Sequence, residues 1–189
     1  RRNKFEVLEN PIDLNRRILD GVLKKGDTVI DATCGNGHDS TYIAEKIGGS
    51  GTLYCFDVQA DAIHNTKIFI SLGKDMPKCT FLQESHENLE LFVNIKVDCI
   101  FYNLGYLPNS DKTIITKSDT TIKSLQSAFK VLKPNGIISM LSYLTHDHHA
   151  EYEEIKRFLL SLDHNEFSIA ETNFILRKTS PVLFIIEKL

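Results

Sequence analysis

The stretch that decides the fold reads Thr28-Val-Ile-Asp-Ala-Thr-Cys-Gly-Asn-Gly-His-Asp39: a short apolar run, an acidic residue and a turn with two glycines. Apolar β-branched residues favour a strand, and glycine permits a tight turn at which the backbone can approach a ligand. Residues 38–47 then have helical spacing and stop at Gly48-Gly49. The stretch therefore predicts a strand, a glycine turn and a helix whose first N–H groups attract a negative group.

On both sides of this unit, short β-type runs alternate with amphipathic stretches. Besides 38–47, we expect helices at 13–23, 60–72, 120–131 and 151–162, and strands at 28–32, 51–57, 79–83, 97–103, 136–142, 167–176 and 182–186. Such alternation requires right-handed crossovers and a parallel sheet with helices on both faces. Because no helix separates the last two runs, we expect them to pair as an antiparallel hairpin. The sequence thus predicts an α/β fold, mostly parallel, that ends in an antiparallel hairpin.

The composition is that of a globular protein. Hydrophobic residues make up 42% and charged residues 25% of the 189 residues, which suits one folded domain over residues 1–189. The net charge is −3, from 22 Lys and Arg against 25 Asp and Glu. This balance excludes a uniformly basic nucleic-acid-binding surface but permits a local basic patch. No apolar stretch approaches the ~18 residues of a membrane helix, so we expect no membrane partner.

The cysteines and the first residues bear on location and metal binding. No C-x-x-C pair and no zinc-type spacing with histidine occurs among Cys34, Cys55, Cys79 and Cys99, so we expect no metal site. Residues 1–10 lack the apolar segment of a signal peptide. We therefore expect reduced thiols and a cytoplasmic protein.

The unusual residues lie where the predicted strands end, and ligands bind at the carboxyl ends of strands in such sheets. Asp31 ends the first strand, just before the glycine turn, and Asp57 ends the second. A carboxylate in the place of Asp57 can accept both hydroxyls of a ribose. The alternatives are an ordinary tight turn and a solvated or helix-capping Asp. Together the two features predict a nucleoside site.

Ser40 and Asp31 favour one nucleoside over another. The dinucleotide fingerprint needs a third Gly or Ala for helix packing, and Ser40 stands at that position instead. The acidic Asp31 would repel a pyrophosphate but attract an ammonium. S-adenosylmethionine carries an ammonium, a carboxylate and a sulfonium, which suits one Asp and one helix N-terminus. The pattern therefore favours S-adenosylmethionine, whereas NAD fits poorly.

Later segments offer further candidates, each with an ordinary alternative. Ser85 and His86 follow the third strand and could flank an adenine, or simply be a helix cap and a surface histidine. Asn103 and Tyr106 offer a carbonyl acceptor and an aromatic face to an amine-bearing base, or form a loop with a packing tyrosine. His146 follows the fifth strand in a His-rich loop, either solvated or near a reacting amine as a base.

These motifs together resemble the class I S-adenosylmethionine-dependent methyltransferases. The resemblance rests on four stretches that span most of the chain: Asp31-Ala-Thr-Cys-Gly-Asn-Gly-His-Asp39, Ser85-His-Glu-Asn-Leu89, Asn103-Leu-Gly-Tyr-Leu-Pro108 with Asp111-Lys112, and Leu132-Lys-Pro-Asn-Gly136. More narrowly, they are similar to the group labelled "putative rRNA methylases", with which a tRNA 5-aminomethyl-2-thiouridine methyltransferase is associated. The resemblance implies a Rossmann-like sheet of seven strands, a methyl donor in the pocket of the first turn, and a homodimer. Family members often carry Gly-His-x-Gly-Gly after the fifth strand, whereas this chain has Leu144-Thr-His-Asp-His-His149.

The resemblance also implies site residues and a reaction. The expected cofactor-binding residues are Asp31, Gly35, Asn36, His38, Asp57, Gln59, Ser85 and His86, and the expected substrate-side residues are Asn103, Tyr106, Asp111 and His146. The expected reaction N-methylates the 5-aminomethyl group of 5-aminomethyl-2-thiouridine at the tRNA wobble position, with the anticodon loop as partner and S-adenosylhomocysteine as product. Three alternatives stay open: a methyltransferase for rRNA or a small molecule, a nicotinamide-dependent enzyme, and an inactive nucleoside-binding module.

Overall fold

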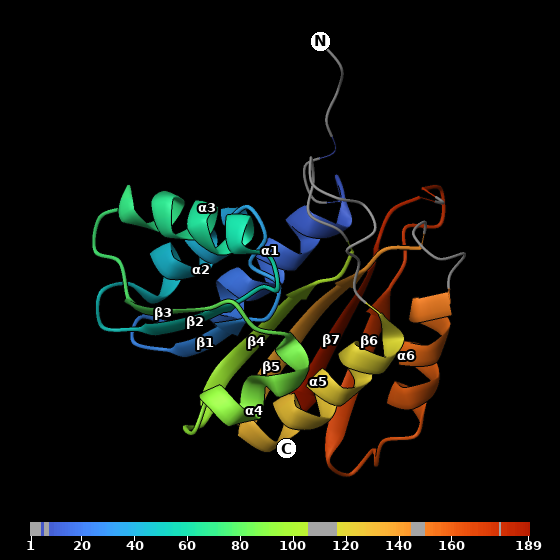
Figure 1. Cartoon of the computed structure of the whole chain (residues 1–189). Helices are drawn as coiled ribbons and strands as arrows, with labels where there is room; N and C mark the ends of the chain where they lie inside the picture. Colours follow the sequence, from blue (N-terminus) through green and yellow to red (C-terminus); the bar gives the residue numbers. More distant parts are fainter. Residues whose placement is uncertain (1–4, 6–7, 106–116, 145–149, 178) are drawn as a thin grey trace.

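The computed structural model describes residues 5, 8–105, 117–144, 150–177 and 179–189 (Figure 1). In this part of the chain, seven strands form one sheet in the order β3-β2-β1-β4-β5-β7-β6. The strands are β1 (Thr28–Asp31), β2 (Thr52–Phe56), β3 (Lys78–Leu82), β4 (Val97–Asn103), β5 (Leu132–Ser142), β6 (Phe167–Thr172) and β7 (Val182–Lys188). The first five are parallel, and β7 runs antiparallel to both β5 and β6. The predicted parallel sheet with its C-terminal hairpin is confirmed.

Helices cover both faces of the sheet (Figure 1). One face carries α1 (Pro11–Val22), α2 (His38–Ile47) and α3 (Ala60–Ser71). The other carries the 3₁₀ turn η1 (His86–Asn88), α4 (Leu89–Phe92), α5 (Ser118–Val131) and α6 (Ala150–Leu160). α1 begins two residues earlier than expected, because the Asn10 side chain accepts the N–H of Asp13 at 2.8 Å and Pro11 fits the first turn.

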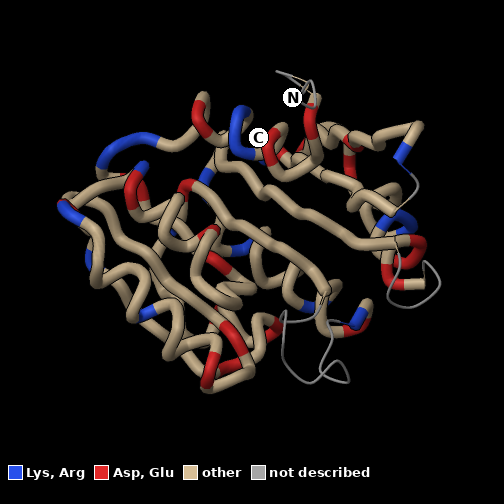
Figure 2. The backbone as a smooth tube through the Cα atoms, turned by 90° about the horizontal axis from the view of Figure 1, so that it is seen from above, with Lys and Arg blue, Asp and Glu red and all other residues tan. Residues whose placement is uncertain are grey.

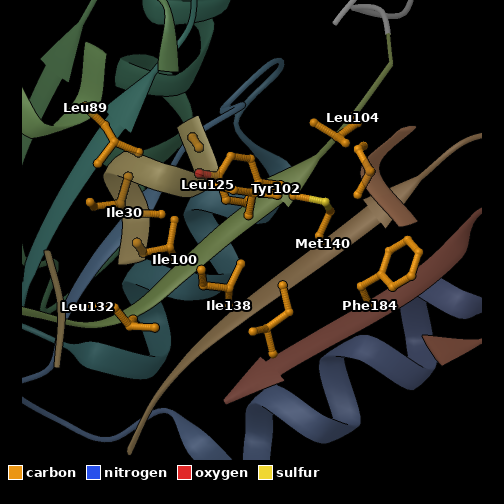
Figure 3. Packing of buried hydrophobic residues seen from close by; sticks show 14 of the residues in the cluster. Ile30, Leu89, Ile100, Tyr102, Leu104, Leu125, Leu132, Ile138, Met140 and Phe184 are labelled. Atoms are coloured by element: carbon orange, nitrogen blue, oxygen red, sulfur yellow. The ribbon is translucent and has the colours of Figure 1, made fainter. Parts of the chain in front are cut away.

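Two apolar cores explain why the central strand β4 reads as a continuous apolar run. Ile100 and Tyr102 pack toward α4, α5 and α6, with Met140 and Phe184 from neighbouring strands (Figure 3). Cys99 and Phe101 point to the opposite face and pack under α1, α2 and α3. Strands in parallel sheets are covered by helices on both faces, so apolar residues do not alternate with polar ones along them.

Some element boundaries differ from the sequence prediction. β5 begins at Leu132 rather than at residue 136, because Leu132 pairs with Val97 before the register resumes at Cys99 and Ile137. The intervening residues bulge out of register, and Asn135 has a φ of 61°. β6 ends at Thr172 rather than at 176. η1 and α4 were not predicted, since such short elements show no helical period.

The strand order switches at β1, which lies between β2 and β4. Asp31 pairs with Cys55 of β2 and Phe101 of β4, so the carboxyl ends of the three strands lie at one edge. Crossovers that leave β1 and β4 on opposite faces open a crevice at this edge.

No helix among the described residues has the length and apolar character needed to cross a membrane.

Candidate functional site

The turn after β1 depends on two glycines with left-handed backbone angles. Gly35 has a φ of 51° and Gly37 a φ of 86°. A Cβ on Gly37 would lie 2.8 Å from the Cα of Thr66 in α3, so a side chain is excluded there. Gly37 is the N-cap residue of α2 and provides no side-chain cap. The first N–H groups of α2 are therefore left to a ligand, and they favour a negatively charged group such as a carboxylate.

Asp57, directly after β2, holds this turn in place. Its two carboxylate oxygens accept the backbone N–H groups of Gly35 and Gln59, each at 3.0 Å. Burial raises the pKa of the Asp57 carboxyl, while these backbone N–H groups counter the shift. A carboxylate has about four lone-pair sites, so two backbone bonds leave room for two hydroxyls. The position of Asp57 fits the predicted ribose contact and adds a structural duty that the sequence did not indicate.

Asp31 is completely buried beneath the turn rather than facing an open pocket. Its oxygens accept hydrogen bonds from the Ser40 hydroxyl, at 2.5 Å, and from the Thr33 N–H, at 3.1 Å. Burial raises the pKa of Asp31 to about 7. The hydrogen bond from Ser40 lowers this pKa, and the nearby charge of Asp39 raises it further. The predicted direct contact between Asp31 and the ammonium of a donor stays a prediction. The structure gives Asp31 the additional role of joining the turn to α2.

Residues of α3 support the turn from outside, and no local sequence pattern indicated them. Thr66 donates its hydroxyl hydrogen to the Gly35 carbonyl at 3.2 Å. Asn65 donates from Nδ2 to the Oδ1 of Asn36 at 3.2 Å. The exposed ring of His38 lies 5.0 Å from that of Phe69. Side chains from neighbouring positions of α3 thus meet the segment that holds the predicted donor residues Asn36 and His38.

Ser85 and His86 lie beside the carboxyl end of β3, as expected. Ser85 is the N-cap residue of η1, where its hydroxyl accepts the Glu87 N–H at 3.4 Å. His86 is buried, contrary to the surface alternative, and its ring lies edge-on to Tyr102 at 5.8 Å. Burial lowers the pKa of His86 to about 4, so the imidazole is neutral near pH 7. A neutral ring in an apolar wall suits a contact with an uncharged base such as adenine.

Asn103 ends β4 and faces the turn between β1 and α2, residues 32–37, which we call the donor turn. Its backbone N–H donates to the Thr33 hydroxyl at 2.6 Å, and its Nδ2 donates to Asp39 Oδ2 at 3.0 Å. The other oxygen of Asp39 contacts Arg16 of α1 at 3.3 Å. Asp39 was part of the quoted motif but not of the predicted site. An acidic residue in the first turn of a helix commonly stabilises the helix N-terminus, so the sequence alone indicated no other role for Asp39.

The other substrate-side predictions, Tyr106, Asp111 and His146, lie outside the described residues. Gln59 is the N-cap residue of α3, two residues beyond Asp57.

Basic and acidic residues are interspersed along the described chain (Figure 2). Arg16 of α1 is paired with Asp39, and Arg177, between β6 and β7, lies over the rings of Phe5 and Phe174.

The charge around the turn indicates the kind of ligand it accepts. Asp39 and Asp57 form an acidic rim at the turn, Asp31 is buried beneath it, and Arg16 contacts Asp39. Such a site disfavours a diphosphate and favours a ligand that carries positive charge. The glycine cradle, the uncapped start of α2 and the acidic rim therefore fit S-adenosylmethionine. Within the described ranges, no group of three His, Cys, Asp or Glu residues could hold a metal ion.

Comparison with known proteins agrees with this geometry. A family model described as "Putative rRNA methylase" matches residues 53–188. The tRNA (mnm5s2U34)-methyltransferase, chloroplastic, of Arabidopsis thaliana is 35% identical over 182 residues. This alignment includes 90% of the present chain and 66% of the Arabidopsis protein, so the chain spans just under two thirds of that relative.

Solved structures show the same fold over nearly the whole chain. A structure from Clostridium thermocellum described as a "putative rRNA-methylase" has a TM-score of 0.92 and 34% identity, covering 97% of this chain and 100% of that one. SMU.1697c of Streptococcus mutans, described as "a putative methyltransferase" and solved in complex with SAH, has a TM-score of 0.85 and 27% identity, covering 97% of this chain and 100% of that one. The predicted Rossmann-like methyltransferase fold is confirmed. The chain belongs to the "putative rRNA methylase" family of class I methyltransferases, enzymes that use S-adenosylmethionine as cofactor.

Proposed function

We propose that this protein methylates the exocyclic amine of 5-aminomethyl-2-thiouridine at the wobble position of tRNA, producing 5-methylaminomethyl-2-thiouridine. The observation that carries the proposal is the position of Asn103, which two hydrogen bonds, at 2.6 and 3.0 Å, hold against the donor turn. A side-chain amide at the end of β4 can accept an N–H from an amine that approaches the donor. The named activity of the 35% identical Arabidopsis relative supports this choice of acceptor.

The donor side of the reaction follows from the turn between β1 and α2. Bound S-adenosylmethionine supplies a methyl group on a positively charged sulfur. Asp57 would hold the ribose hydroxyls, the start of α2 the carboxylate, and His86 one side of the adenine. Positioning of donor and acceptor about 3 Å apart can supply roughly 7–11 kcal/mol of the barrier, so little covalent help is needed from protein groups.

The acceptor side requires an amine with a free lone pair. The substrate's alkylammonium first loses a proton to solvent, because the protonated nitrogen cannot attack. The nitrogen then forms a bond to the methyl carbon while the carbon–sulfur bond breaks and sulfur keeps the electron pair. A wobble base lies in a single-stranded loop and can leave its stack to reach such a site. Described basic side chains available for phosphate contacts include the exposed Lys117 at the start of α5.

A direct test uses purified protein, S-adenosylmethionine and tRNA from cells that accumulate 5-aminomethyl-2-thiouridine. We expect the tRNA nucleosides to gain one methyl group on this base, measured by mass spectrometry of the digested tRNA. Ribosomal RNA and unmodified tRNA transcripts are the comparison substrates. Methylation of rRNA alone would support the alternative that the family's name suggests and contradict the tRNA proposal.

The same assay tests the role of Asp57. Asp57→Ala removes two acceptors for backbone N–H groups as well as the proposed ribose contact, so we expect the KM for S-adenosylmethionine to rise at least about tenfold. Glu45→Ala is the matched control, because it removes an exposed carboxylate from α2 away from the turn. An unchanged donor KM in Asp57→Ala would exclude the ribose contact.

A further inference from the structure

Asn103 is held by two residues that follow β1, 70 and 64 residues away in sequence. The Thr33 hydroxyl accepts its backbone N–H and so locates the end of β4. The Asp39 carboxylate accepts its side-chain Nδ2, which determines how the amide is turned. Both contacts come from the donor side of the crevice, so the candidate substrate residue is positioned by the donor turn.

The chemistry of the partner determines the orientation of this amide. An asparagine has a donor end and an acceptor end that are almost equal in shape, and only its hydrogen bonds distinguish them. A carboxylate is purely an acceptor, so Asp39 can bind the Nδ2 end of Asn103 but not the Oδ1 end. The Oδ1 of Asn103 therefore faces away from Asp39. A neutral amide in place of Asp39 could pair with either end and would leave the orientation undetermined.

Asp39 is itself held from the other side. Its second oxygen contacts Arg16 Nη2 of α1 at 3.3 Å, and the Arg16 guanidinium lies over the Tyr42 ring, 5.2 Å from its centroid. The side chain of Asp39 is 19% exposed, so water competes little for its oxygens. A carboxylate fixed at both oxygens can serve as a rigid support for a third group.

We propose that Asp39 is a positioning residue that turns the carbonyl oxygen of Asn103 toward the amine that is methylated. This inference rests on the proposed function, because it requires a nitrogen acceptor. The oxygen accepts one N–H of the amine and leaves the lone pair directed at the methyl carbon. Positive charge develops on the nitrogen as the new bond forms, so this hydrogen bond is stronger in the transition state than in the ground state.

The test exchanges the two side chains. Asn103→Asp places a carboxylate against the carboxylate of Asp39, and we expect kcat on tRNA to fall by roughly 100-fold. Asp39→Asn leaves the amide orientation undetermined, and we expect kcat to fall by roughly tenfold while the affinity for S-adenosylhomocysteine falls much less. In the double variant, the amide introduced at position 39 donates to the carboxylate at position 103, which again presents an oxygen to the amine. The double variant should therefore be at least about tenfold more active than Asn103→Asp.

Two further measurements separate positioning from a structural role. The ratio of Asn103→Asp activity to wild-type activity should rise as the pH falls, because one proton shared by the two carboxyl groups restores a hydrogen bond between them, while protonation of the substrate amine affects both proteins equally. Arg16→Gln breaks the ion pair but leaves the Asp39–Asn103 bond, so its kcat should fall less than that of Asp39→Asn. Titration calorimetry with S-adenosylhomocysteine reports whether each variant keeps its donor site.

The outcomes distinguish the two proposals. If the wild type methylates the tRNA but the exchange restores no activity, the positioning role of Asp39 is wrong and the proposed function stands. If Asp39→Asn loses affinity for S-adenosylhomocysteine as strongly as it loses kcat, Asp39 belongs to the donor site and the inference is likewise wrong. If the wild type methylates no tRNA, the proposed function fails and the inference fails with it.

Discussion

Asp31 is a completely buried carboxyl group whose two oxygens bond to Ser40 and to the Thr33 N–H. Burial disfavours the charged form, which is why its pKa rises from 3.8 to about 7. The same residue joins the end of β1 to the first turn of α2. One side chain therefore links the stability of the donor turn to pH.

This link predicts how stability depends on pH. Between pH 4 and 7 the folded protein keeps a proton on Asp31 that the unfolded chain releases, so stability falls as pH rises through this range. The slope is at most about 1.4 kcal/mol per pH unit, and the total loss is at most about 4 kcal/mol. Asp31→Asn removes the titration, so its free energy of unfolding should depend less on pH than that of the wild type.

Urea unfolding of both proteins between pH 5 and 8, without ligand, measures this difference. His86 titrates in both proteins, and its lowered pKa of about 4 costs stability only as the pH falls below its ordinary value, so its contribution cancels in the comparison. Parallel curves for wild type and Asp31→Asn would show that Asp31 has an ordinary pKa in the folded state.

At the scale of elements, the turn between β1 and α2 is held by two other elements. The end of β2 contributes Asp57, and α3 contributes Thr66 and Asn65. The backbone at Gly37 approaches α3 so closely that the two elements leave no space for a Cβ. The shape of the donor site is therefore a property of three packed elements rather than of a loop.

Gly37→Ala tests this dependence. A non-glycine residue at a φ of 86° is strained by roughly 1–2 kcal/mol, and a Cβ 2.8 Å from Thr66 Cα forces the backbone apart. We expect a loss of stability of at least about 2 kcal/mol, and affinity for S-adenosylhomocysteine weakened at least about tenfold. Urea unfolding and titration calorimetry measure the two effects.

Gly21→Ala is the matched control. Gly21 lies within α1, and a Cβ there would meet no atom within 4 Å. Alanine in a helix interior is more stable than glycine by roughly 0.5–1 kcal/mol, so this variant should gain stability and bind ligand normally. Equal behaviour of the two alanine variants would mean that the turn does not require the observed backbone angle at Gly37.

For the molecule as a whole, two cores on opposite faces of the sheet meet at the strand-order switch beside β1. The residues of the site come from both sides of this switch, since the turn packs with α2 and α3, while His86 follows β3 and Asn103 ends β4. A ligand bound there would contact residues at or after the carboxyl ends of β1, β2, β3 and β4. Donor binding should therefore stabilise the whole folded chain.

Thermal unfolding with ligands tests this expectation. S-adenosylhomocysteine at 100 times its Kd stabilises the folded state by about 2.7 kcal/mol, which for a chain of this size raises Tm by roughly 5–10 °C. NAD at the same concentration should leave Tm unchanged, because its diphosphate meets the acidic rim of Asp39 and Asp57. A rise in Tm with NAD alone would contradict the choice of cofactor.

Much of the fold was predictable because it depends on local periodicity. Apolar runs such as 97–103 and glycine stops such as Gly48-Gly49 indicate the order of strands and helices, which determines a parallel sheet with a final hairpin. The boundaries at β5 and β6 were less accurate, because a register shift and strand pairing determine them.

The candidate site was predictable only in part. Glycines and strand-end acids mark the edge of the sheet, so Gly35, Asp57 and Asn103 were identified from the sequence. Asp39 and Thr66 were missed, because their partners are far away in the chain and nothing in the local pattern distinguishes them from ordinary helix residues. The burial of His86 was missed for the same reason.

The amino-acid sequence by itself determined the class of this protein: the order of its elements, the glycine turn and the acidic residues that end its first two strands, all of which depend on neighbours along the chain. Only the tertiary structure decided which of these groups meet. Asp31 is enclosed with Ser40, and Asp39 reaches Asn103, because parallel strands distant in sequence end at the same edge of the sheet. Charge states and hydrogen-bond orientation follow from that packing, since burial and contact act through space rather than along the chain.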